Sequence, residues 1–282
     1  MTYEIIDSHV HYWEPERPDR PWHKGGVALG TPLAADRLLD EADDAGVGKI
    51  LQVTPSLMGW DNRYGIEAAQ RYPDRIIGVI GRFDPTAGEM ERRLAQLAAE
   101  PLILGVRITL IKDWSTWLRD GTLEAFFAEA GRLDLRVQLY GPNQAAEMRA
   151  AALRHPQTVF LIDHMALSHH DEQPFAKWND VLALADAPNV YVKVSYFPEV
   201  SQVKYPFADV VPYFRSLYER FGADRLIWGS NYPPSASACT YKENVEFTRR
   251  LPFLDDAARA KIFGQTLLRS LSCHRVSAAL SS

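Results

Sequence analysis

The sequence predicts an α/β fold in which residues 1–282 form a single (β/α)8 barrel of the TIM type. Three features carry this prediction: eight short apolar runs, longer amphipathic stretches between them, and a Pro or Gly where helices are expected to end. Parallel strands buried on both faces form near-continuous apolar runs, and eight βα units in series close into a barrel. An open doubly wound sheet shows the same alternation, but the count of eight favours the barrel.

The eight apolar runs are rich in Ile, Val and Leu, as expected of strands covered on both faces. Roughly 25 to 45 residues separate most runs from the next, which leaves room for a helix after each strand. The runs span Tyr3–Ile6, Lys49–Val53, Ile76–Ile80, Leu102–Ile108, Leu135–Leu139, Val159–Ile162, Val190–Val194 and Leu226–Trp228.

Amphipathic stretches between the runs predict helices, because their apolar residues recur at helical spacing. In Leu33–Ala45, for example, Leu38, Leu39 and Ala42 share one face. The other expected helices are Met90–Ala99, Leu123–Leu133, Ala145–Arg154 and Val210–Phe221. A Pro or Gly then marks several helix exits, because neither residue favours continuing a helix.

Two segments are expected to hold no regular structure. The longer one, Tyr12–Thr31, contains three prolines and is expected to form a loop after the first strand. The tail from Val276 is small and polar and is expected to fray.

The composition is that of an average globular protein, with 46% hydrophobic and 24% charged residues. The net charge of −5 argues against nucleic acid or an anionic membrane as the main partner. No stretch approaches the ~18 apolar residues of a membrane span, and the first residues lack a signal-peptide pattern. Cys239 and Cys273 form no disulfide framework, so we expect a cytoplasmic protein, and a homo-oligomer is left open.

Polar or titratable residues follow every apolar run. Because the carboxyl ends of barrel strands meet at one mouth, we expect these residues to form a site there. The segments are Asp7-Ser8-His9-Val10-His11, Thr54-Pro55-Ser56, Arg82-Phe83-Asp84, Arg107-Ile108-Thr109, Gln138-Leu139-Tyr140, Asp163-His164-Met165, Lys193-Val194-Ser195-Tyr196 and Ser230-Asn231-Tyr232.

The pair His9-x-His11 is the strongest single signal at these strand ends. Residues i and i+2 of a strand face the same side, so both imidazoles are expected to point into the mouth. Such a pair can bind a divalent metal or polarise an oxygen atom of a substrate.

Five motifs resemble the amidohydrolase superfamily and, within it, the amidohydrolase 2 branch. They are Asp7-Ser8-His9-Val10-His11-Tyr12-Trp13, Gly105-Val106-Arg107, Ile162-Asp163-His164-Met165, Val192-Lys193-Val194-Ser195 and Trp228-Gly229-Ser230-Asn231-Tyr232-Pro233. That branch includes 2-pyrone-4,6-dicarboxylate lactonase and the sugar-acid lactonases. The resemblance implies a distorted (β/α)8 barrel and the hydrolysis of a cyclic ester.

The resemblance also bears on a cofactor. Metal-dependent members add a His or Lys from the fifth strand and an Asp from the eighth, where this chain has Gln138, Tyr140 and Asn231. His9, His11 and His164 remain as three imidazoles that could bind one divalent metal, and zinc is the first candidate. The dicarboxylate lactonase of the branch works without a metal, so no metal is expected to be required, and the histidines would then polarise the lactone carbonyl.

Asn231 stands where the branch has a carboxylate that takes a proton from the attacking water. A carboxamide has no useful basicity near neutral pH, so this departure puts the hydrolytic mechanism in question. Three interpretations stay open: an engineered Asp→Asn change, a natural Asn with another base, or a chain that has lost hydrolysis and only binds.

Cations near the strand ends predict an anionic small-molecule substrate. Arg107 and Lys193 fall in the family's motifs and are the first candidates to bind it. The further substrate-binding candidates are Tyr140, Arg82, Thr54 and Trp13. Arg82 could instead pair with Asp84, and Asp163 is expected to point away from the mouth as a structural residue.

The function expected from these residues and the resemblance is a hydrolase that opens a small, carboxylated lactone in aromatic or sugar-acid catabolism. His9, His11, His164 and Asn231 are its expected catalytic residues. The alternatives are a metal-dependent decarboxylase or hydratase of the same superfamily, and a catalytically impaired binder or engineered mutant.

Overall fold

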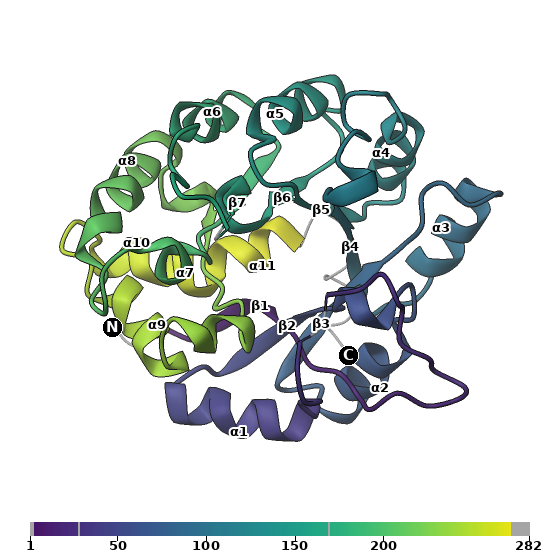
Figure 1. Ribbon diagram of the computed structural model, residues 1–282, viewed down its shortest axis with the longest axis horizontal. Helices are drawn as coiled ribbons and strands as arrows, with labels where there is room; N and C mark the ends of the chain where they lie inside the picture. The colour runs from purple at the N-terminus through teal and green to yellow at the C-terminus, as the bar shows by residue number, and fades with distance from the viewer. Residues whose placement is uncertain (1–2, 28, 169, 272–282) are drawn as a thin grey trace.

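The computed structural model describes residues 3–27, 29–168 and 170–271 (Figure 1). One sheet of eight parallel strands follows chain order from β1 to β8, and helices lie around its outside. The expected (β/α)8 barrel is therefore confirmed. The strands are β1 Ile6–Val10, β2 Lys49–Val53, β3 Ile76–Arg82, β4 Ile103–Thr109, β5 Arg136–Tyr140, β6 Phe160–Ile162, β7 Val190–Lys193 and β8 Leu226–Ile227.

Strand β1 begins at Ile6 rather than at Tyr3, so it contains polar residues that an apolar run does not predict. Asp7 can stay buried within it because its carboxylate accepts hydrogen bonds. The Ser230 backbone N–H donates to Oδ1 at 2.9 Å, and the Tyr241 hydroxyl donates to Oδ2 at 2.7 Å. These bonds hold the start of the barrel against the segment after β8.

The barrel is distorted where β1 meets β2. Asp7 pairs with Ile50 and Val10 pairs with Gln52, so β1 has one extra residue between these pairs. Such a bulge re-aims the side chains beside it. It thereby lets His9 reach the barrel interior, although regular alternation would place it on the same face as Asp7.

The ring closes between β8 and β1 with few backbone hydrogen bonds. Ser8 donates to the Trp228 carbonyl at 3.4 Å, and His11 donates to the Tyr232 carbonyl at 2.8 Å.

All five expected helices are present, and the described residues form six more that the periodicity did not single out. Helix α2 is one of these, and its buried face consists of the small residues Gly65, Ala68 and Ala69. The helices are α1 Ala35–Ala45, α2 Arg63–Arg71, α3 Met90–Ala98, α4 Glu124–Arg132, α5 Ala145–Arg154, α6 Trp178–Ala183, α7 Phe197–Val200, α8 Val211–Phe221, α9 Tyr241–Arg249, α10 Asp256–Ala260 and α11 Thr266–Leu271.

The segment expected to be a loop has no helix or strand in its described residues, and Arg17 and Arg20 form an isolated bridge there. The tail from Val276 lies outside the described residues, as does Cys273. Within the described ranges, no helix has both the length and the apolar character needed to cross a membrane.

Helix α11 closes the end of the barrel opposite the mouth, and Figure 1 shows it inside the ring of strands. Leu267 and Leu271 pack against interior residues such as Ile6 and Leu161. The buried guanidinium of Arg136 on β5 fastens this helix, because Nη2 donates to the Leu271 carbonyl at 3.1 Å and Nε donates to the Ser270 carbonyl.

Arg136→Met should lower the free energy of unfolding by about 2–4 kcal/mol, because it leaves two buried carbonyls without their donor. Denaturant unfolding measures this change. Arg132→Met is the matched control, since Arg132 is exposed and its ion pair in the described structure is with Glu129 on its own helix. Equal effects of the two substitutions would mean that α11 does not depend on Arg136.

Candidate active site

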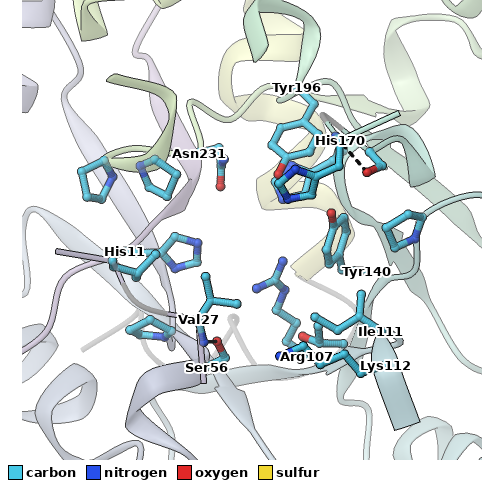
Figure 2. Close-up of a pocket in the computed structure, with 18 residues that line it drawn as sticks. His11, Val27, Ser56, Arg107, Ile111, Lys112, Tyr140, His170, Tyr196 and Asn231 are labelled. Atoms are coloured by element: carbon cyan, nitrogen blue, oxygen red, sulfur yellow. Dashed lines mark hydrogen bonds between the residues drawn. The ribbon is translucent and has the colours of Figure 1, made fainter. Parts of the chain in front are cut away.

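A cavity of about 590 Å³ opens at the carboxyl ends of the strands. Figure 2 shows side chains from opposite sides of the barrel pointing into it, with Arg107 and Tyr140 facing His11 and Asn231. Of the residues expected to be catalytic or to bind the substrate, these four and His164 line the cavity. The strand ends thus bring together polar side chains that lie far apart in the sequence.

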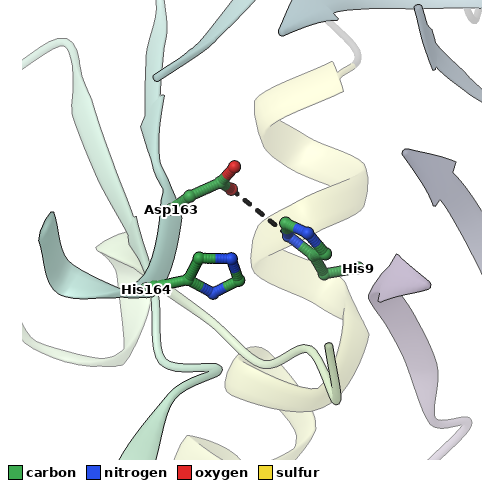
Figure 3. A group of neighbouring side chains, drawn as sticks. All are labelled: His9, Asp163 and His164. Atoms are coloured by element: carbon green, nitrogen blue, oxygen red, sulfur yellow. Dashed lines mark ion pairs between the residues drawn. The ribbon is translucent and has the colours of Figure 1, made fainter. Parts of the chain in front are cut away.

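A buried cluster of His9, Asp163 and His164 adjoins this cavity (Figure 3). Ligand atoms of the three residues all lie within 4.8 Å of one another. The His9 and His164 ring centroids are 4.5 Å apart, and His9 Nδ1 lies 3.3 Å from Asp163 Oδ1. We expected His11 as the third potential ligand, but among the described residues Asp163 completes this cluster instead.

The expectation that Asp163 points away from the mouth is wrong. Leu161 faces the barrel interior, and Asp163 follows it two residues later on the same side. His164 would then face outward, but His164, Met165 and Ala166 have φ values of 55°, 56° and 54°. This left-handed turn brings the imidazole back to the cavity, so both neighbours reach the site.

Asp163 is the charge centre of the site. Arg107 Nε donates to its Oδ2 at 2.8 Å, Gln138 Nε2 donates to the same oxygen at 2.9 Å, and Lys193 Nζ lies 3.6 Å from Oδ1. Burial alone would raise the pKa of Asp163, but the two cations outweigh it and hold that pKa below its usual value. The carboxylate is therefore ionised at neutral pH.

Burial and neighbouring cations keep the three histidines neutral. Burial lowers the pKa of His9 and of His164 well below the usual value, and it lowers the pKa of His11 to about 3 with help from Arg107. His11 Nδ1 lies 2.7 Å from the Val53 carbonyl, which can only accept, so Nδ1 carries the proton and Nε2 keeps its lone pair.

His164 is fixed by contacts on two sides. Its Nδ1 lies 2.7 Å from the Ser195 hydroxyl oxygen. Tyr196 stacks on the ring with centroids 4.0 Å apart and an interplanar angle of 18°. Tyr196 also lines the cavity; it belongs to a strand-end segment that we expected at the mouth, but we had not singled it out as a catalytic or substrate-binding residue.

Lys193 lies in the barrel interior and is not one of the described residues that line the cavity. Its Nζ donates to the Ser8 carbonyl at 2.7 Å and to Gln138 Oε1 at 2.8 Å. Burial lowers the pKa of Lys193 to about 8. The structure therefore places this lysine where it supports Asp163 rather than where a substrate would touch it.

The other expected substrate-binding residues lie at different depths. Arg107 lines the cavity, and its guanidinium carbon lies 5.4 Å from the centre of the Tyr140 ring. Arg82 is buried and donates to Thr109 Oγ1 and the Gly59 carbonyl, each at 3.1 Å, so these replace the pairing with Asp84 that we had considered. Thr54 and Trp13 are buried and do not line the described cavity.

Glu199 is a functional candidate that sequence reasoning missed. Asn231 Nδ2 donates to its Oε1 at 3.0 Å. Burial raises the pKa of Glu199 to about 8. No sequence signal links the two residues, because they are 32 positions apart and meet only when α7 packs beside the segment after β8.

Comparisons with known proteins agree with this geometry. L-fucono-1,5-lactonase of Burkholderia ambifaria is 28% identical over 274 residues, covering 94% of this chain and 93% of that protein. The 4-sulfomuconolactone hydrolase of Rhizobium radiobacter is 26% identical over 239 residues, covering 81% of this chain and 75% of that protein. An amidohydrolase from Burkholderia multivorans, crystallised with bound zinc, superposes with a TM-score of 0.79 at 22% identity, covering 95% of this chain and 99% of that chain. The family model described as Amidohydrolase matches residues 6–269, so the chain belongs to the amidohydrolase family.

Proposed function

We propose that this protein hydrolyses a small, carboxylated lactone from sugar-acid or aromatic catabolism. The observation that carries the proposal is the group of neutral imidazoles gathered around an ionised Asp163, next to a cavity with a cationic wall. Lactone hydrolases among its relatives support the same reaction class. We further propose that the whole chain acts as one catalytic unit on small molecules in the cytoplasm.

Arg107 and Tyr140 are placed to hold the substrate. Arg107 commits Nε to Asp163 and reaches the cavity with its guanidinium, so its remaining N–H groups can grip a carboxylate. The Tyr140 hydroxyl can donate to a second oxygen atom of the substrate. A neutral lactone would leave this cationic wall unmatched, which is why we favour a carboxylated one.

The hydrolysis needs a polarised carbonyl, an aligned water and a proton acceptor. In our proposal the carbonyl oxygen lies at His9 and His164, which polarise it directly when no metal is held between them, and Asn231 aligns the water through its amide oxygen. His11 Nε2 takes the water proton as the water oxygen bonds to the carbonyl carbon. It then returns the proton to the ring oxygen when the C–O bond breaks, which leaves a hydroxy acid.

The donor set also fits one zinc ion. Both ring nitrogens of His9 and Oδ1 of Asp163 are buried and have no hydrogen-bond partner among the described residues. Two imidazoles and a carboxylate are ordinary zinc ligands, and a bound zinc would lower the pKa of a coordinated water. We therefore propose that His9, His164 and Asp163 hold zinc, and the expectation that no metal is required becomes doubtful.

Metal analysis of the purified protein tests the zinc proposal directly. We expect about one zinc per chain, and we expect His9→Ala to lose it because two ligands rarely retain zinc. His155→Ala is the matched control, since His155 pairs with Glu124 far from the cluster. Metal-free protein with full lactonase activity would refute the proposal.

Arg107→Met should raise KM for a carboxylated lactone about 10- to 100-fold and leave KM for a neutral sugar lactone nearly unchanged. The reason is that the substitution removes the cation facing the cavity. Steady-state kinetics on both substrates gives the ratio of the two KM changes. A general effect of the substitution on Asp163 would alter both KM values alike and leave this ratio unchanged. A ratio that stays constant would show that Arg107 does not select the charge of the substrate.

Asn231→Asp should raise kcat about 10-fold or more, because it places a carboxylate base where we propose that the water is aligned. Rates for pyrone dicarboxylates, muconolactones and sugar lactones, with and without zinc, measure the effect. An unchanged rate would remove position 231 from the water site. If neither form opened any lactone, the decarboxylase, hydratase and binder alternatives would replace this proposal.

A further inference from the structure

The side chain of Asn231 is fixed at one end. Its backbone is left-handed, with φ 57°, which Asn tolerates better than most residues. Its amide nitrogen donates to Glu199 Oε1 at 3.0 Å. An amide offers a donor nitrogen and an acceptor oxygen on opposite sides, so a nitrogen held by Glu199 turns the oxygen the other way. Figure 2 shows the Asn231 side chain directed into the cavity.

Glu199 lies behind this wall of the cavity. It lines a second cavity of about 470 Å³, which shares Tyr196, Asn231 and Pro234 with the first. Its Oε2 is buried and has no hydrogen-bond partner among the described residues. Burial is the main cause of its raised pKa, and the hydrogen bond from Asn231 counteracts that rise.

The titratable groups near Glu199 are Tyr196, Cys239 and Lys204. The Glu199 backbone N–H donates to the Tyr196 carbonyl at 3.1 Å. Burial raises the pKa of the Tyr196 hydroxyl and of the Cys239 thiol, so neither is ionised at neutral pH. Lys204 lines the second cavity but forms no ion pair with Glu199 within 4.0 Å in the described structure. The hydrogen bond from Asn231 is therefore the side-chain contact of the Glu199 carboxyl group on which we base the inference.

We propose that Glu199 is a positioning residue for lactone hydrolysis, which holds the Asn231 amide so that its oxygen faces the cavity and accepts a hydrogen bond from the attacking water. This inference rests on the proposed function. Without the Glu199 acceptor, the amide could turn by half a rotation and present its N–H groups to the water. A donor at that point would orient the water with its lone pair away from the carbonyl.

The pair also explains how position 231 can be Asn. Two carboxylates this close cannot both be ionised, so an Asp at 231 would require Glu199 to keep a proton and donate it. With Asn231, the amide provides that one donor and Glu199 can be the acceptor. In either case a single donor lies between the two side chains, and the oxygen of residue 231 faces the cavity.

Substitutions at position 199 test whether it acts by accepting a hydrogen bond. Glu199→Met keeps the length of the side chain but removes the acceptor, so we expect kcat to fall about 10- to 100-fold with KM changed less than about 3-fold. Glu199→Gln keeps an acceptor for Asn231, so we expect it to retain kcat within about 3-fold. Lys204→Met is the control, because it alters the same second cavity without touching Asn231.

The outcomes separate the possible roles. Equal loss in Glu199→Met and Glu199→Gln would make Glu199 a proton acceptor and overturn the positioning role, and full activity in both would overturn it as well. Failure of the wild type to open any lactone would defeat the proposed function instead.

A structural readout keeps the inference testable without activity. In protein labelled with ¹⁵N at Asn, we expect the side-chain amide signal that Asn231→Asp removes to exchange slowly in the wild type and in Glu199→Gln. The same signal should exchange fast in a folded Glu199→Met protein. Slow exchange in all three would contradict the proposal.

Discussion

The buried ion pair between Arg107 and Asp163 is the interaction on which the rest of the site depends. It joins β4 to the end of β6 across the barrel interior, with a distance of 2.8 Å and almost no solvent exposure on either side chain. Gln138 and Lys193 complete the surroundings of the carboxylate, and Lys193 in turn holds the Ser8 carbonyl of β1. A buried charge is costly unless it is paired, so these residues fix one another in place.

The chemistry of the histidines follows from this network. Arg107 and Lys193 add positive charge beside rings that are already desolvated, so the imidazoles stay neutral and keep lone pairs for a proton or a metal. The same arrangement leaves one face of Arg107 for the substrate. In the proposed mechanism, binding of an anion and activation of its carbonyl thus rest on the same residues, which would couple substrate recognition to catalysis.

The sequence predicted the barrel and most strand ends because buried parallel strands carry a dense apolar signal that needs no long-range information. It also brought His11, Arg107, Tyr140, His164 and Asn231 to one mouth, because barrel topology decides where strands end. The orientation of Asp163 was predicted wrongly because the turn at His164 has a left-handed backbone, and the sequence has no Gly there to indicate one. Glu199 was missed because its role depends on a contact between α7 and the loop after β8.

The central claim is that an ionised Asp163 organises a site for lactone hydrolysis. It is tested most directly by the kcat of Asp163→Asn on a carboxylated lactone that the wild type opens, with the fold checked by circular dichroism. The account predicts that kcat falls about 100-fold or more, because Arg107, Lys193 and His9 lose their common counter-charge. A folded Asp163→Asn protein with wild-type kcat would contradict it.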